Sequence, residues 1–75
     1  MKTLLEVPAQ KTVKIVSIVG GKGARQILAQ MGIGVGSRIT VSRNAPFSGP
    51  LLIKAHGTTI ALGRGIAKKL LVEEE

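Results

Sequence analysis

The sequence contains no cysteine, aspartate, tyrosine or tryptophan, and it has one histidine and one phenylalanine among 75 residues. Without cysteine it forms neither a disulfide framework nor a thiolate that could bind a metal or act as a nucleophile, so a reducing compartment is expected. His56 is the only imidazole, too little for a metal-ligand cluster, an acid–base pair or a catalytic triad. The composition predicts a protein that is not an enzyme and that has no resident cofactor or metal.

Long hydrophobic runs are also missing. A membrane-spanning helix needs about 20 consecutive apolar residues, whereas the longest apolar stretches here, residues 15–21 and 32–36, are short and interrupted by glycine. The N-terminal segment lacks the apolar region and the cleavage site of a secretory signal. We therefore expect a soluble cytoplasmic chain, or at most one that is peripheral to a membrane.

Acidic residues are scarce and lie only at the two ends of the chain, as Glu6 and residues 73–75. Residues 7–72 contain no acid and ten of the eleven basic residues, which gives this body a charge of about +10. Such a body attracts an acidic protein face, an anionic lipid surface or nucleic acid. The simpler alternative is that scattered lysines only keep a small apolar protein in solution.

The pattern of residues 11–19 predicts a first strand. The segment is rich in β-branched residues and ends at Gly20, but its apolar positions change phase between Ile15 and Val16. One extra residue in a strand moves the inward-facing set to the other side, so the phase change predicts a β-bulge.

The period then becomes helical. Ala24, Ile27, Leu28 and Met31 fall at i, i+3, i+4 and i+7, which predicts an amphipathic helix with these four side chains turned inward. Met31 is thus expected in the core. Gly32 follows at once and is suited to the left-handed conformation that ends a helix.

The rest of the chain predicts short strands separated by glycine- and proline-rich turns. Alternating apolar residues place strands at 37–43, 51–56, 58–62 and 70–72, with a turn-rich loop at 44–50, a tight hairpin at 56–59 and a helical turn at 66–69. We expect one domain over residues 1–75, mainly β: a small SH3-like barrel of about five antiparallel strands, with one short helix between the first two strands and a helical turn before the last. Residues expected to serve structure are Met31, Gly32, Gly36, Gly49 and Gly57.

A series of short motifs follows one another along residues 4–72. They are Met31-Gly32-Ile33 at the end of the helix, Gly36 before the strand Ile39-Thr40-Val41, Arg43 to Phe47, Gly49 to Ile53, and Gly57 before Ile60-Ala61-Leu62. In this order the motifs resemble those of the FeoA family of ferrous iron transport accessory proteins, and they are specific in combination rather than singly.

The chain also departs from the family pattern at three places. It lacks a glycine at Ala9 or Gln10, it has Val35 where proline is common, and Gly65-Ile66 replaces the usual glutamate. The last departure makes this chain more basic than most members.

The resemblance implies an SH3-like barrel that supports ferrous iron uptake by binding the membrane transporter FeoB, whose cytosolic part is a G protein. It implies no catalysis, no cofactor and no metal ligand, and it leaves self-association open. An alternative is a small basic barrel that binds nucleic acid or regulates transcription, since similar barrels occur in iron-dependent repressors. Single-strand binders of this size stack bases on aromatic rings, and only Phe47 is available here, so nucleic acid is the weaker alternative.

A candidate partner surface follows from the position of Phe47 in the loop 44–50, with basic residues on both sides in the sequence. Aromatic side chains surrounded by cations often anchor interfaces, so the first candidates are Arg43, Phe47, Lys54 and Arg64. The alternative is that Phe47 only closes an open end of the barrel.

Overall fold

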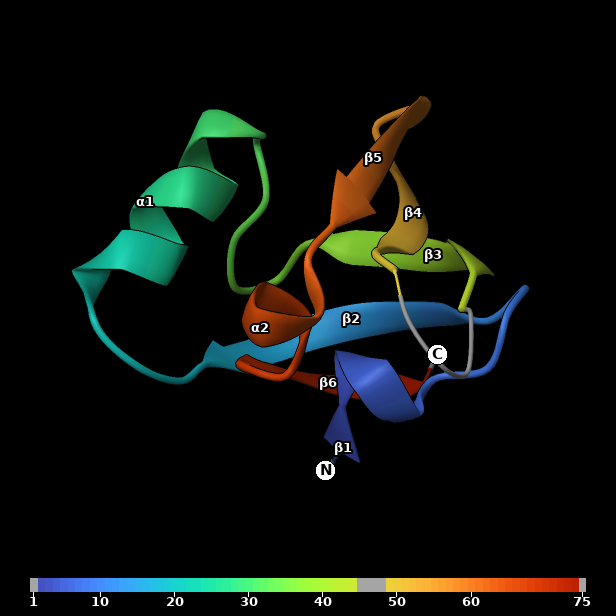
Figure 1. Ribbon diagram of the computed structural model, residues 1–75, viewed down its shortest axis with the longest axis horizontal. Coiled ribbons are helices and arrows are strands. Elements are labelled where there is room, and N and C mark those ends of the chain that lie inside the picture. The colour runs from blue at the N-terminus through green and yellow to red at the C-terminus, as the bar shows by residue number, and fades with distance from the viewer. Residues whose placement is uncertain (1, 45–48, 75) are drawn as a thin grey trace.

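The computed structural model describes residues 2–44 and 49–74 (Figure 1). In chain order the elements are β1 (Lys2–Thr3), the 3₁₀ helix η1 (Leu4–Glu6), β2 (Thr12–Ile18), α1 (Lys22–Gln30), β3 (Arg38–Arg43), β4 (Leu51–Ala55), β5 (Thr58–Leu62), α2 (Arg64–Ala67) and β6 (Leu70–Glu74). None of the helices described is long and apolar enough to cross a membrane.

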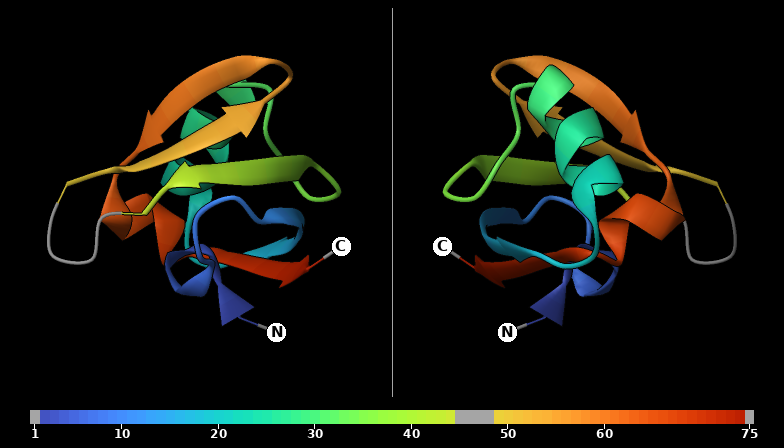
Figure 2. Two further views of the ribbon diagram at one scale, coloured as in Figure 1. Left: turned by 90° about the vertical axis from the view of Figure 1, so that its right-hand side faces the viewer. Right: turned by 90° about the vertical axis from the view of Figure 1, so that its left-hand side faces the viewer.

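The strands form one curled antiparallel sheet in the order β1-β6-β2-β3-β4-β5, the SH3-like barrel that the sequence predicts. The sheet has six strands rather than about five, because the two-residue strand β1 pairs with β6. So short a strand leaves no alternation to detect in the sequence. Figure 2 shows the β4–β5 hairpin at one end of the curl and β6 with β1 at the other.

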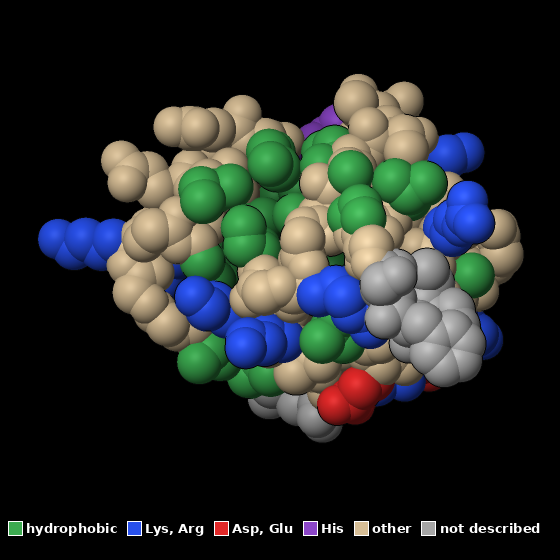
Figure 3. All heavy atoms as spheres, viewed as in Figure 1, with side chains coloured by type: hydrophobic (Ala, Val, Ile, Leu, Met, Phe, Trp, Pro, Cys, Tyr) green, Lys and Arg blue, Asp and Glu red, His purple; other side chains and the backbone are tan. Residues whose placement is uncertain are grey.

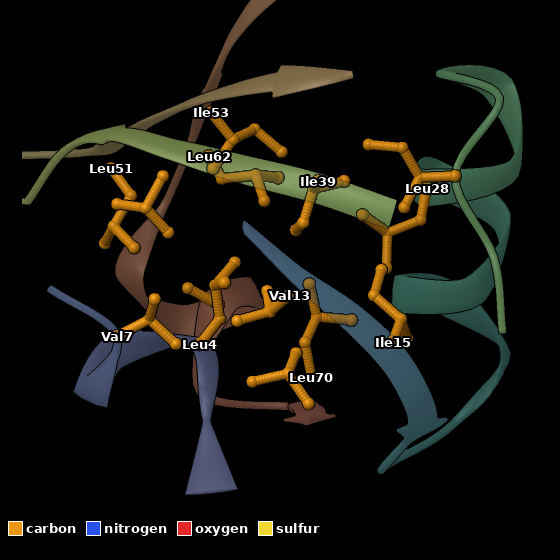
Figure 4. Close-up of a cluster of buried hydrophobic side chains, with 14 of the residues drawn as sticks. Leu4, Val7, Val13, Ile15, Leu28, Ile39, Leu51, Ile53, Leu62 and Leu70 are labelled. Atoms are coloured by element: carbon orange, nitrogen blue, oxygen red, sulfur yellow. The ribbon is translucent and has the colours of Figure 1, made fainter. Parts of the chain in front are cut away.

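The core lies inside the curl and is built from nearly every element. Figure 4 shows buried aliphatic side chains converging from η1, α1 and the strands. The predicted bulge in β2 is confirmed, since the register with β6 shifts between Ile15 and Ser17. The fully buried large side chains are Leu4, Ile15, Leu28, Ile39, Leu51, Ile53, Leu62, Leu70, Val7, Val13, Val41 and Val72.

Helix α1 contacts the core with a narrower stripe than its sequence predicts. Ala24 and Leu28 are buried, but Ile27 and Met31 are 42% and 36% exposed. The expectation that Met31 belongs to the core was therefore wrong. The helix lies to one side of the curled sheet (Figure 1). Of its apolar face, only Ala24 and Leu28 are buried.

Positive backbone φ angles confirm the predicted turns. Gly32 has φ +76° where α1 ends, and the β4–β5 hairpin turns through His56 (φ +54°) and Gly57 (φ +75°). Two consecutive residues with positive φ form the type I′ turn that matches the twist of a two-residue hairpin. The other glycines expected to serve structure, Gly36 and Gly49, also have positive φ, at +94° and +87°.

The acidic C-terminal segment is more ordered than a solvated tail. Strand β6 continues through Glu73 and Glu74, whereas the sequence pattern ends it at Val72. Glu74 Oε1 accepts a hydrogen bond from Lys2 Nζ at 3.0 Å. This bond and the charge of Lys2 lower the pKa of Glu74 below its ordinary value.

Candidate functional site

The outer side of the sheet carries cations and hydroxyls where the inner side carries aliphatic residues. We call this outer surface of β2–β5 the cationic face, and it comprises Thr12, Lys14, Arg38, Thr40, Lys54 and Thr59. All six alternate along their strands with inward-facing residues, and all except the half-buried Thr40 are exposed. Alternation of this kind places one set of residues in the core and the other in solvent.

Strand register sets these side chains in two rows. In the first row Lys14 lies opposite Arg38 on β3 and, on its other side, opposite Glu73 on β6. In the second row Thr12, Thr40, Lys54 and Thr59 follow one another across four strands. The hydroxyls of Thr12 and Thr40 share a hydrogen bond of 2.9 Å.

Lys14 and Arg38 place two positive charges directly opposite each other on neighbouring strands, and Arg38 also has an interaction within the protein. Like charges directly opposite on neighbouring strands destabilise a sheet. Within the described residues, Glu73 is the one acid whose strand register places it next to this pair. An anionic surface placed against the face would meet both positive charges.

An open hollow of about 650 Å³ lies at one end of the cationic face. It is lined by Lys14, Val35, Gly36, Ser37, Arg38 and His56. In the loop between α1 and β3, the Gly34 amide donates a hydrogen bond to Ser37 Oγ at 3.0 Å. The His56 ring lies against the same loop, with Nε2 3.0 Å from the Gly32 carbonyl oxygen. A shallow basic hollow suits acidic side chains of a macromolecule better than it suits an enclosed small ligand.

A metal centre within one chain needs a group of ligating side chains. No three histidine, aspartate or glutamate side chains come together in residues 2–44 and 49–74. The ring nitrogen Nε2 of His56 is engaged with the Gly32 carbonyl.

The structure brings together two of the four predicted contact residues. Arg43 pairs with Leu52, and Leu52 and Lys54 point to the same side of β4, so Arg43 lies on the outer side with Lys54. Arg64 is half-buried at the start of α2 and belongs to no strand of this surface. Phe47 lies outside the described residues.

Lys14 and Arg38 were missed as candidates. Lys14 follows the inward-facing Val13 on β2, and Arg38 precedes the inward-facing Ile39 on β3. Lys14 and Arg38 lie directly opposite each other in the strand register. The alternation that assigned the inward residues also assigned these two outward. What the alternation leaves open is which strands are neighbours, so the sequence does not show that the two cations meet.

The curled sheet with one lateral helix defines a class, the small SH3-like barrel domains, and this member carries an exposed basic sheet face. The family model described as FeoA domain matches residues 2–74. The chain therefore belongs to the FeoA family.

Known proteins agree with this assignment. The chain is 47% identical over 57 residues to a protein described as a candidate Fe(2+) transport protein A in Methanocaldococcus jannaschii, a match that covers 76% of this chain and 67% of the relative. It is also similar to the crystal structure of an iron uptake regulatory protein (FeoA), with 32% identity, a TM-score of 0.88 and coverage of 99% of this chain and 96% of the other.

The same fold occurs within a larger protein. A manganese-dependent transcriptional repressor matches with a TM-score of 0.90 and 21% identity, over 99% of this chain but 41% of the repressor. At this identity the likeness concerns the fold alone.

Proposed function

We propose that this protein is a non-catalytic accessory of ferrous iron transport that acts in the cytoplasm by binding the cytosolic G-protein part of a FeoB-type transporter. Membership of the FeoA family and the likeness to an Fe(2+) transport protein A support the assignment to iron transport. The cationic face supports the binding mode. Attachment to the membrane would be indirect, through the transporter.

The observation that carries the binding mode is the grouping of Lys14, Arg38 and Lys54 on one exposed sheet surface. Residues 7–72 contain no acid, so Glu73 is the nearest negative charge in the strand register. A surface of one sign steers an oppositely charged partner and raises the association rate, an effect that salt screens. The proposed partner surface is therefore acidic.

The test is a titration of the purified cytosolic domain of the transporter against this protein, at about 50 mM and about 150 mM salt. Lys54→Glu reverses a charge on the cationic face. Lys22→Glu makes the same change in net charge at an exposed site on α1. We expect Lys54→Glu to weaken binding about tenfold, chiefly through a slower association at low salt, and Lys22→Glu to have little effect.

Nucleic acid is the competing partner, because a basic sheet face also suits a phosphate backbone. Binding of that kind would fall steeply with salt, in proportion to the number of phosphates contacted. Tight binding to duplex or single-stranded DNA at physiological salt, without any response to the transporter domain, would overturn the proposed function.

A further inference from the structure

We infer that the free edge of β5 binds an extended segment of the partner protein, in which acidic and apolar side chains alternate. The inference rests on the proposed function for the identity of the partner. The edge of β5 is a different surface from the cationic face.

The edge exists because β5 is the last strand of the sheet. It pairs with β4 on one side and, within the described residues, with no strand on the other. The two-residue turn makes Ala55 and Thr58 a hydrogen-bonded pair, and such pairs recur at every second residue of an antiparallel ladder. Ile60 and Leu62 therefore face β4 with their backbone groups, whereas Thr59 and Ala61 direct theirs away from the sheet.

The backbone groups of Thr59 and Ala61 on this edge have no hydrogen-bond partner in the described part of the chain. Both residues are exposed, and because buried backbone groups without a partner are rare in proteins, we take these amides and carbonyls to be open to water. An exposed row of donors and acceptors is a template for another strand. The two exposed residues supply two donors and two acceptors.

The inner side of an added strand would meet apolar surface. Hydrophobic side chains gather between α1 and β5 in Figure 3. Ile27 of α1 and Met31, which follows the last residue of the helix, are exposed aliphatic side chains. Strand β5 contributes Ile60, which is half-buried against the core. A strand added at this edge would cover part of this apolar surface.

The outer side of an added strand would meet positive charge. Thr59 lies directly opposite Lys54, so an added strand would extend the second row of the cationic face beyond Thr59. Because the two sides of a strand alternate, a segment that matches both surfaces alternates acidic with apolar residues. A second copy of this chain fits poorly, since its body carries the same excess of positive charge.

The test uses a synthetic peptide of eight residues that alternates valine and glutamate, with a block-ordered peptide of the same composition as the reference. Binding is followed by the amide resonances of the isotope-labelled protein and by hydrogen exchange at Thr59 and Ala61. We expect the alternating peptide to protect these two amides from exchange and to bind about tenfold more tightly than the block-ordered one.

Two variants separate strand addition from nonspecific attraction. Ala61→Pro removes the outward amide without touching the ladder to β4, a position where a sheet tolerates proline. Ala61→Val keeps the amide and adds bulk on the same outward side. We expect proline to reduce affinity for the peptide and for the transporter domain about tenfold, and valine to change it little.

Equal loss with both variants, or binding of both peptides without protection at Thr59 and Ala61, would overturn the inference. Transporter binding that is undiminished in Ala61→Pro would overturn it too, while leaving the proposed function in place. A dimer of the protein that Ala61→Pro dissociates would overturn the choice of partner, because the edge would then bind a second copy. Protection by the alternating peptide with no binding of the transporter domain would support the edge site and contradict the proposed function.

Discussion

The inward- and outward-facing residues of the same strands differ in chemistry and in burial. On β4, Leu51, Ile53 and Ala55 point inward and are buried, while Lys54 between them is exposed. The inner residues are aliphatic and fit a closed core, whereas the outer residues are threonines and cations. The difference teaches that burial, and with it stability, comes from the inner side, whereas the outer side presents charged and hydroxyl groups at the surface.

Truncating an inner residue should have the largest effect. Ile53→Ala removes a fully buried side chain from the centre of the core and should lower the free energy of unfolding by about 2–5 kcal/mol. A small domain has little stability to lose. Urea unfolding followed by circular dichroism measures the change, and a loss below about 1 kcal/mol would show that the core is not packed as described.

Gly32, the residue after the C-cap of α1, tests how much the end of this helix contributes to stability. Its φ of +76° is a conformation that other residues adopt at a cost, so Gly32→Ala should destabilise the protein by about 1 kcal/mol. The added methyl group would lie 3.6 Å from His56 Cδ2, an ordinary contact, so strain in the backbone is the main cause.

Gly23 provides the matched control. It lies within α1 with a negative φ and open space around it, so Gly23→Ala should raise stability by about 0.5 kcal/mol. Equal changes in melting temperature for Gly32→Ala and Gly23→Ala would contradict the left-handed conformation of Gly32 at the end of α1.

Charge reversal on the outer side should scarcely change stability. Lys54 is exposed and makes no ion pair within the described residues. Substitutions at such sites usually alter the free energy of unfolding by less than about 0.5 kcal/mol. The thermal unfolding curve of Lys54→Glu should therefore superimpose closely on that of the parent. A fall in melting temperature as large as that of Ile53→Ala would show that the outer side contributes to stability as much as the inner side.

The smallest effect is expected at the junction of β1 and β6. Because the pKa of Glu74 is lowered by Lys2, the folded state holds its proton less tightly than the unfolded chain. The bond therefore stabilises the fold above the unfolded pKa, near 4.5, and this contribution is lost as the pH falls through the lower folded pKa. Glu74→Gln should melt slightly below the parent at neutral pH and together with it in acid, and a difference that grows in acid would have the wrong sign.

Short-range patterns in the sequence were enough to predict most of the fold. The bulge in β2, the hairpin at His56 and Gly57, and the left-handed Gly32 each leave a signal within a few residues. What the patterns could not show was set by packing between distant parts of the chain. The depth at which α1 lies, and hence the exposure of Ile27 and Met31, depends on the curl of the sheet.

The candidate site was harder to predict because it depends on which strands become neighbours. Arg43 and Lys54 were identified from the sequence, but the meeting of Lys14 with Arg38 follows only from the pairing of β2 with β3. The extension of β6 to Glu74 was missed for a similar reason. Its acidic residues give no apolar alternation, and their place in the sheet depends on β2.

The central claim is that the protein binds the cytosolic domain of a transporter through the outer side of its sheet. The most direct measurement is the change in amide resonances of the isotope-labelled protein as the unlabelled transporter domain is added at physiological salt. The account predicts saturable shifts that cluster on β2–β5 around Lys14, Arg38 and Lys54. Shifts confined to the polar side of α1, around Lys22 and Gln26, or no shifts at all, would contradict it.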